Sequence, residues 1–335
     1  MDLGSTQLIV KTMAKSFYEY AKKGKSFPVT DDDIIDRLRL WPSHEMEKGS
    51  VFTIGSCFAR NIEEALSSVG YDVPMLEFSV PEEESPGLPR QNGIINKYTL
   101  QNILQFLDWI TQCQADGKNI VAASYRFAYV GKESSKIVDL DMSGFIPVSE
   151  ERFERRRIEL FDAANKIREC DYVVITLGQT EAWRYGPMNC FFNRAPVSRY
   201  LMDTHKFTWL DSVNHNSAMV YARQIVGHVR NLNPTSKIIF SVSPIAASDY
   251  WNAKDGLMGY WDSKIILRDT AIGVSNMYKD VFYYPSFDAV AMLDRDKRGV
   301  ADETVRRVVG SLTNKDVPLQ GHDDYFDNVY GENFR

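Results

Sequence analysis

The stretch around Gly55 constrains the fold more than any other, because it predicts a strand, a tight turn and a helix in direct succession. Val51 to Ile54 form an apolar, mostly β-branched run that stops at Gly55, and a helical apolar pattern follows. Ser56 and Cys57, two potential nucleophiles, stand in the turn. In an open α/β sheet such a turn lies where ligand sites form. Backbone N–H groups and the helix dipole there can lower a thiol pKa or hold an oxyanion.

Three further apolar runs lack polar alternation and therefore predict strands buried on both faces of a parallel sheet. They are residues 172–177, 238–242 and 281–284, and helical patterns accompany them at 98–109, 152–168, 215–231, 257–279 and 302–313. Alternating strands and helices predict an α/β fold, a three-layer α/β/α sandwich with a mostly parallel sheet. A short second strand is expected at 71–76.

The rest of the chain is interpreted as additions to one domain at 46–314. Residues 1–45 are expected to form an N-terminal helical arm, with helices at 11–22 and from residue 31 to 40, and residues 315–335 a C-terminal tail. Insertions are expected near 79–97, 120–150 and 183–214: a Pro-rich loop, a small β excursion and an aromatic-rich segment. The aromatic segment suits a lid over a sugar or acyl group, or it packs the insertion down.

Bulk properties exclude several classes of function. The net charge of −6 argues against general nucleic-acid binding, which needs a basic surface. No apolar run approaches the roughly 18–20 residues of a membrane span, and the N-terminus lacks a basic region followed by an apolar stretch. The four cysteines show no paired or metal-binding spacing. We therefore expect a cytoplasmic protein with free thiols, no metal and no cofactor.

Residues 55–59, Gly-Ser-Cys-Phe-Ala, spell the motif that names the GSCFA family. Blocks that resemble the family's other signatures follow in order at 92–98, 176–183, 241–244, 263–268 and 284–288, so the resemblance spans about residues 45–313. The family in turn resembles the SGNH (GDSL-like) hydrolases, which cleave or transfer esters and often act on carbohydrates. The resemblance implies a flavodoxin-like, SGNH-type sheet.

Two residues compete as the nucleophile that the resemblance implies. Aligning the motif with the Gly-Asp-Ser block of SGNH hydrolases places Cys57 on the serine and Ser56 on the aspartate. A thiol is also the stronger nucleophile, and a helix N-terminus could generate its thiolate, whereas Ser56 needs a general base. The structural alternative is that Ser56 caps the helix and Cys57 is a small buried hydrophobe.

Further site residues are expected where other strands end. The turn after residue 177 corresponds to the Gly-x-Asn-Asp block of SGNH hydrolases, with Thr180 in place of the Asn. Its backbone or side chains could hold an oxyanion, or it could begin a helix capped by Thr180. The expected oxyanion-supporting or substrate-binding residues are Gly55, Asn92, Gly178, Gln179, Thr180, Glu181, Ser243 and Arg298.

The general base is missing from its usual place. SGNH hydrolases carry Asp-x-x-His before the last helix, but here the third residue after Asp296 is Gly299. Asp296 is therefore the candidate base and Arg298 a candidate for binding an anionic group, unless the segment is a solvated charged turn. Among the histidines, His205 and His215 lie on the expected edge of the sheet, although ordinary packing roles explain both.

Lys264 and Arg268 are spaced four residues apart and so share one helix face, where they could bind an anion such as a phosphate or remain surface charges.

These features predict an esterase or O-acyltransferase that acts on a carbohydrate or related ester, as in polysaccharide biosynthesis. A small-molecule or glycan ester is the expected partner, and the transferase version needs an acyl donor such as acetyl-CoA. The alternative is a noncatalytic glycan-binding or assembly protein on a degenerate hydrolase fold, which the missing histidine supports. A Rossmann-type dinucleotide enzyme is remote, because no Gly-x-Gly-x-x-Gly follows the first strand.

Overall fold

A four-stranded parallel sheet organises the protein. The computed structural model describes residues 30–38, 46–86, 88, 90–113, 117–131, 135–247, 249–293 and 302–313. The sheet has the order β1-β4-β8-β9, with β1 at Val51–Gly55, β4 at Tyr172–Leu177, β8 at Lys237–Val242 and β9 at Val281–Tyr284. All three strand pairs are parallel, so the four carboxyl ends lie along one edge. The four runs predicted from apolar residues are all confirmed as strands.

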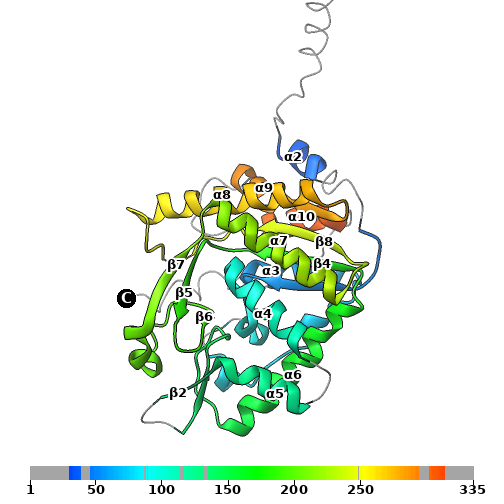
Figure 1. The fold of residues 1–335 in the computed structure, drawn as a ribbon. Helices are drawn as coiled ribbons and strands as arrows, with labels where there is room; N and C mark the ends of the chain where they lie inside the picture. Colours follow the sequence, from blue (N-terminus) through cyan, green and yellow to red (C-terminus); the bar gives the residue numbers. More distant parts are fainter. Residues whose placement is uncertain are drawn as a thin grey trace, which may run out of the picture.

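Helices cover both faces of this sheet and make three layers (Figure 1). The first face is covered by α4 (Leu100–Gln112), α6 (Glu150–Asn165), α7 (His215–Leu232) and α8 (Gly256–Met277). The second face is covered by α3 (Cys57–Ser68), α9 (Ser286–Leu293) and α10 (Asp302–Thr313), with α2 (Asp31–Leu38) packed against α9 and α10. The predicted α/β three-layer architecture is therefore confirmed.

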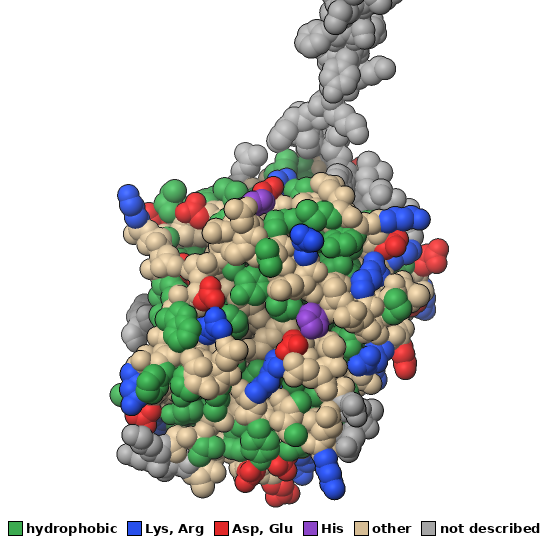
Figure 2. Space-filling view, viewed as in Figure 1, with side chains coloured by type: hydrophobic (Ala, Val, Ile, Leu, Met, Phe, Trp, Pro, Cys, Tyr) green, Lys and Arg blue, Asp and Glu red, His purple; other side chains and the backbone are tan. Residues whose placement is uncertain are grey.

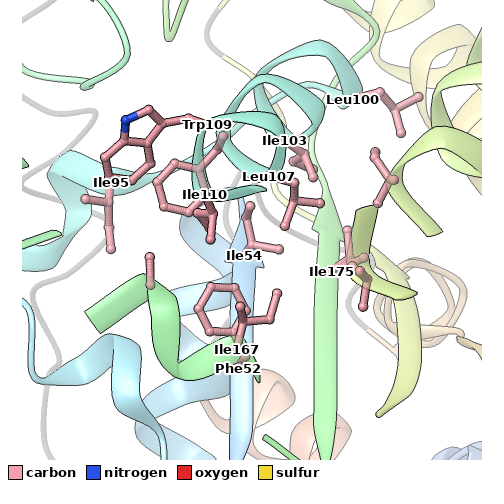
Figure 3. Packing of buried hydrophobic residues seen from close by; sticks show 14 of the residues in the cluster. Phe52, Ile54, Ile95, Leu100, Ile103, Leu107, Trp109, Ile110, Ile167 and Ile175 are labelled. Atoms are coloured by element: carbon pink, nitrogen blue, oxygen red, sulfur yellow. The ribbon is translucent and has the colours of Figure 1, made fainter. Parts of the chain in front are cut away.

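Alternate residues of each strand enter different cores. Phe52 and Ile54 of β1 pack in the larger core on the first face, whereas Val51 packs in the smaller core on the second. Figure 3 shows Leu107 and Ile110 of α4 lying over Ile54 in the larger core. This division follows from the period-2 alternation of side chains along a strand.

Side-chain caps fix the starts of several helices. Thr99 Oγ1 accepts from Asn102 N at 3.2 Å at the start of α4, and Asp255 Oδ1 accepts from Met258 N at 2.9 Å at the start of α8. Asn214 and Ser217 form a capping box at α7. Each cap satisfies a backbone N–H that has no partner within its helix.

The strand predicted at 71–76 is wrong in length and type. The chain there makes a single parallel bridge from Asp72 to Ser50 and then turns into the 3₁₀ segment Pro74–Leu76. Pro74 has no backbone N–H to donate and favours the first turn of a helix, which explains why the strand stops. The bridge lies on the outer side of β1, and the sheet itself keeps its four strands in the order β1-β4-β8-β9.

The additions to the sheet are small sheets and short helices. In the second insertion, β2 (Ala128–Val130) and β3 (Ile137–Asp139) form the expected β excursion, but residues 117–124 form helix α5 (Gly117–Ser124) rather than the start of a strand. The third insertion is an antiparallel sheet of β5 (Glu181–Tyr185), β6 (Cys190–Phe192) and β7 (Thr208–Ser212), with the 3₁₀ segment Arg199–Phe207 before β7. The Pro-rich 79–97 segment contains two 3₁₀ segments.

Other expectations are met in part or fall outside the described residues. The helix expected from residue 31 is present as α2, whereas the helix expected at 11–22 and the tail at 315–335 lie outside the described residues. None of the helices in the described part of the chain is both long and apolar enough to cross a membrane. Figure 2 shows acidic and basic side chains interspersed over the face drawn.

Candidate active site

The turn after β1 contains a buried serine followed by a partly exposed cysteine. Ser56 is the N-cap of α3, and its N–H donates to Thr176 O at 3.1 Å. Its side chain is 2% exposed and makes no capping hydrogen bond, with Oγ 3.4 Å from Thr176 Oγ1. Cys57, the first residue of α3, carries a free thiol and stays partly exposed. The cap position predicted for Ser56 is therefore present, but without the expected side-chain bond, and Cys57 is not fully buried.

Gly55 makes this turn sterically possible. Its φ of +146° lies in a region that L side chains rarely adopt, and a Cβ at this position would overlap the carbonyl oxygen of Thr176. Gly55→Ala is expected to lower the free energy of unfolding by about 2–4 kcal/mol, measured by urea denaturation. Gly227→Ala is the matched control: no atom lies within 4 Å of the added Cβ on α7, so stability should rise by about 0.5–1 kcal/mol. An equal response of both variants would contradict this explanation.

Gly178 joins four segments at the carboxyl edge of the sheet. Its N–H donates to Tyr98 O at 3.1 Å, and its carbonyl oxygen accepts from Lys264 Nζ of α8 at 2.6 Å. A Cβ at residue 178 would lie 3.2 Å from Ser56 Cβ and 2.6 Å from Tyr98 O. The turns after β1 and β4, the segment before α4 and the first half of α8 therefore meet at this glycine.

The surroundings of Cys57 contain cations. Burial raises the pKa of the Cys57 thiol, while the charges of Lys264 and Arg90 and the backbone N–H groups of Phe58 and Cys57 lower it. Burial also raises the pKa of Tyr98, and the Cys57 sulfur acts in the same direction. The thiol thus interacts electrostatically with both the ammonium of Lys264 and the hydroxyl of Tyr98.

The predicted oxyanion turn is present, but most of its backbone donors are occupied. The N–H of Gln179 donates to Tyr98 O at 2.9 Å, and that of Thr180 donates to Ser263 Oγ at 3.1 Å. The helix considered as an alternative start at Thr180 does not occur, because β5 begins at Glu181. The Glu181 carboxylate accepts from Trp251 N at 2.7 Å and from Asn252 N at 3.0 Å, which holds the loop after β8.

Unlike the backbone donors of this turn, the Gln179 side chain has a polar atom without a hydrogen-bond partner among the described residues. This atom, Oε1, is buried. A buried amide oxygen without a partner is costly, and the O and N of an amide are assigned from their hydrogen bonds. Gln179 is therefore the member of this turn whose polar group is free for a ligand.

Two other predicted residues have partners away from Cys57. Asn92 is buried and donates to Glu63 Oε2 at 3.0 Å, so it braces α3. Ser243 is buried in the turn after β8, where its Oγ accepts from Ile245 N at 3.2 Å. The partners of both residues are groups other than the Cys57 thiol, and both remain predictions as substrate contacts.

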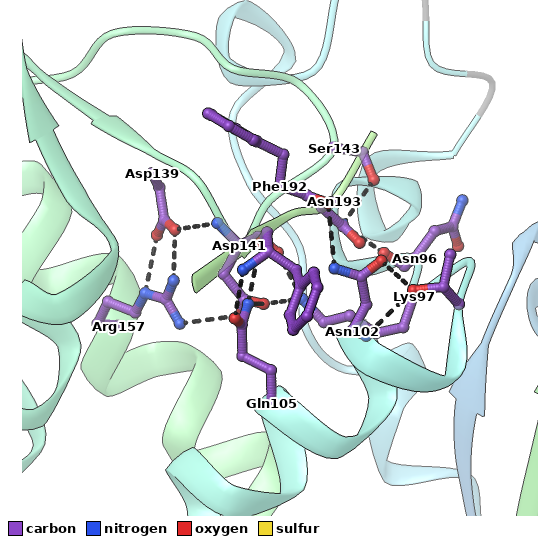
Figure 4. Close-up of polar contacts among 12 residues, drawn as sticks. Asn96, Lys97, Asn102, Gln105, Asp139, Asp141, Ser143, Arg157, Phe192 and Asn193 are labelled. Carbon is purple, nitrogen blue, oxygen red and sulfur yellow. Dashed lines mark hydrogen bonds and ion pairs between the residues drawn. The ribbon is translucent and has the colours of Figure 1, made fainter. Parts of the chain in front are cut away.

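A buried charge network, drawn in Figure 4, holds the segment that carries Tyr98. Lys97 pairs with Asp141 at 2.9 Å, and its backbone N–H donates to Gly55 O at 2.6 Å. Arg157 pairs with Asp139 and, at 3.3 Å, with Asp141. Burial alone would raise the pKa of Asp141, but the two cations hold it below its ordinary value. The network therefore ties the turn after β1 to α6 and the β2–β3 hairpin.

The histidines and remaining charges do not complete a Ser-His-Asp arrangement among the described residues. His205 Nε2 lies 2.6 Å from Pro196 O, and His215 Nδ1 lies 2.9 Å from Asp269 Oδ2. Arg268 is exposed and pairs with Asp288 on α9, whereas Lys264 is buried, so the two do not form the surface cluster considered for an anion. The described residues also hold no cluster of three or more His, Cys, Asp or Glu side chains suited to a metal. The candidates Asp296 and Arg298 lie outside the described residues.

The sequence pointed to Lys264 only as a possible anion-binding group and to Tyr98 only as part of a family block, and it assigned neither to the surroundings of Cys57. Lys264 lies on the buried face of α8 with Leu267 and Ala271, at the spacing i, i+3 and i+7. A lysine on the apolar face of a helix was the available signal. Tyr98 follows a buried lysine and precedes the cap of α4, and only its place in the 92–98 block distinguishes it.

Comparison with known proteins identifies one family. The model of the GSCFA family matches residues 50–309. No curated protein matches the chain significantly, and no solved structure does so either.

Proposed function

Since this chain belongs to the GSCFA family, whose naming motif contains the partly exposed Cys57, we propose that it transfers acyl groups from esters through this thiol. The observation that carries the proposal is the position of Cys57 at the first strand–helix turn, where Lys264 and Tyr98 interact with its thiol electrostatically. A thiol can attack an ester carbonyl and leave again as a thiolate. Such a nucleophile at the carboxyl edge of a parallel sheet is accessible to a ligand bound across that edge.

The choice of Cys57 over Ser56 rests on exposure and electrostatics. Ser56 is 2% exposed, and among the described residues its hydroxyl has only the long contact to Thr176 Oγ1, although a hydroxyl needs a base to become nucleophilic. The cationic groups around Cys57 favour its thiolate, and the adjacent N–H groups are oriented toward the sulfur. Upon attack these N–H groups are the candidate donors to the oxyanion, and the unpartnered Gln179 Oε1 is a candidate acceptor from a substrate hydroxyl.

A carbohydrate or related ester is the proposed substrate class. The resemblance of the family motifs to SGNH hydrolases supports it. The antiparallel β5–β7 sheet supports it as well, because Trp209 of β7 is 48% exposed and Trp251 is 37% exposed. Trp251 packs edge-on against Trp183 of β5, with ring centroids 5.4 Å apart. Exposed, braced aromatic rings bind the apolar faces of ligands that also offer polar groups.

The acyl acceptor is water in an esterase and a sugar hydroxyl in an O-acyltransferase. In both cases the first half-reaction forms a thioester on Cys57 and releases an alcohol or a thiol. The donor of the transferase version is a thioester such as acetyl-CoA. The second half-reaction releases the acyl group and regenerates the thiol.

Intact-mass analysis after exposure to p-nitrophenyl acetate tests the proposal. We expect one stoichiometric acetyl adduct in the wild type and in Ser56→Ala, and none in Cys57→Ala. The other thiols are internal controls, because burial raises the pKa of Cys113 to about 11 and that of Cys170 and Cys190 to about 12. No adduct on the native protein would favour a noncatalytic glycan-binding or assembly protein instead.

A further inference from the structure

Lys264 occupies an unusual position for a lysine. Its side chain is 0% exposed, and its Nζ donates to Gly178 O at 2.6 Å and lies 5.6 Å from the centre of the Tyr260 ring. No carboxylate within the described part of the chain lies within ion-pair distance of it. Buried cations are normally paired, because removing an ammonium from water is costly. The neutral amine avoids most of that cost.

The electrostatic surroundings of Lys264 point to one proton partner. Burial lowers the pKa of Lys264 to about 7, and the Cys57 sulfur opposes that shift. Reciprocally, Lys264 is the leading group that lowers the pKa of the Cys57 thiol. The effect is mutual, so the protonation state of each group influences how readily the other gives up its proton.

The other charged groups near Cys57 and Lys264 either pair with a different residue or influence only Cys57 or Tyr98. Arg90 acts on Cys57 and forms ion pairs with Glu64, and Arg194 acts on Tyr98. On α8 and the elements packed against it, His215 lies 2.9 Å from Asp269, and Arg268 and Tyr283 both contact Asp288. Neither group is among the causes that shift Lys264.

We propose that Lys264 is the general base of this site, and that its amine accepts the proton of the Cys57 thiol. The inference rests on the proposed function. It assigns the role that the missing Asp-x-x-His histidine would otherwise fill to a residue on α8, a different element of the fold. The Gly178 carbonyl holds the Nζ at the point where the turns after β1 and β4 meet.

Cys57 and Lys264 together account for every proton transfer in both half-reactions. As Sγ attacks the ester carbonyl carbon, its proton passes to the neutral amine of Lys264, and the resulting ammonium protonates the leaving alkoxide. The thioester remains on Cys57 and Lys264 is neutral again. Water or a sugar hydroxyl then attacks the thioester and gives its proton to Lys264, which returns it to the departing thiolate. A base with a pKa near the working pH is the most efficient for such transfers.

A purely structural role makes a different prediction. If Lys264 only anchors the Gly178 carbonyl, its removal changes stability but leaves the acid–base behaviour of Cys57 intact. If it exchanges a proton with Cys57, loss of one proton from the thiol–ammonium state gives both the neutral thiol–amine pair and the reactive thiolate–ammonium pair. Thiol reactivity then rises through pH about 7, instead of following an isolated buried thiol titrating above 9.0.

The experiment measures the rate of Cys57 alkylation by iodoacetamide between pH 5.5 and 10, followed by intact mass in the wild type, Lys264→Met and Lys264→Arg. We expect an inflection near pH 7 in the wild type and its loss in Lys264→Met, with at least about a tenfold slower reaction at pH 7.5. Lys264→Arg should keep a reactive thiol but lose ester turnover, because a guanidinium stays charged and accepts no proton. Lys166→Met, which removes an exposed lysine paired with Glu77, is the control and should match the wild type.

The outcomes separate the inference from the function on which it rests. A wild-type profile with a single inflection at or above pH 9 would overturn the inference without any variant, so the test holds even if Lys264→Met does not fold. An unchanged profile in a folded Lys264→Met would overturn it as well. An inflection near pH 7 with no acetyl adduct would support the proton exchange and overturn the ester chemistry.

Discussion

The Cys57→Ala variant is expected to lose ester turnover by about three orders of magnitude or more, whereas Ser56→Ala should stay within about threefold of the wild type. The reason is geometric. Cys57 is partly exposed and its thiol interacts electrostatically with Lys264, Arg90 and Tyr98, whereas the Ser56 hydroxyl is buried against Thr176. The measurement is steady-state hydrolysis of p-nitrophenyl acetate between pH 5.5 and 9.

The pH dependence of the same reaction adds a second criterion. Below about pH 7 Lys264 is protonated and cannot accept the thiol proton, so the rate should rise as the pH increases through that value. Cys113→Ala, which removes a buried thiol, should leave both the rate and the profile unchanged. Loss of turnover in Ser56→Ala with retention in Cys57→Ala would assign the chemistry to the hydroxyl instead.

The strands of the central sheet are readable from the sequence, because strands buried on both faces are continuously apolar. Thus 172–177 is predicted with its full length. The second strand is not, because the local signal at 71–76 is outweighed by Pro74 and only Asp72 reaches the edge of β1. In the same way, residues 120–127 pair their backbone within α5 and a 3₁₀ turn although their apolar content suits a strand. Tertiary context decides such short segments.

The site residues also differ in whether neighbouring sequence or a long-range contact determines their position. Gly55 and Cys57 can be predicted from the adjacent sequence, because consecutive residues form the strand, turn and helix around them. Lys264 lies more than two hundred residues further along the chain, and its burial arises only when α8 packs over the turn of Gly178. Helical spacing places it on an apolar face, but not beside Cys57. Its role depends on a contact that the sequence pattern does not encode.

The Asp141→Asn variant is expected to lower the free energy of unfolding by about 3–5 kcal/mol at pH 7, which is the cost of breaking a buried ion pair by removing one partner. Asp141 is 0% exposed and lies between Lys97 and Arg157, both of which are also 0% exposed. Without the carboxylate, Lys97 and Arg157 are left with fewer negative partners in the protein interior, which solvates charge poorly. Urea denaturation followed by circular dichroism measures the change, and a difference below about 1 kcal/mol would contradict it.

The pH dependence distinguishes this effect from a general loss of packing. Because Lys97 and Arg157 depress the pKa of Asp141 in the folded state, its contribution is fully present above the ordinary value of 3.8 and is lost as the pH falls through the lower folded value. The stability difference between the wild type and Asp141→Asn should therefore shrink under acid. Glu77→Gln, which breaks the exposed pair with Lys166, should cost at most about 1 kcal/mol at any of these pH values. Since Lys97 precedes Tyr98 and bonds to Gly55, Asp141→Asn should also slow alkylation of Cys57 in the fraction that remains folded.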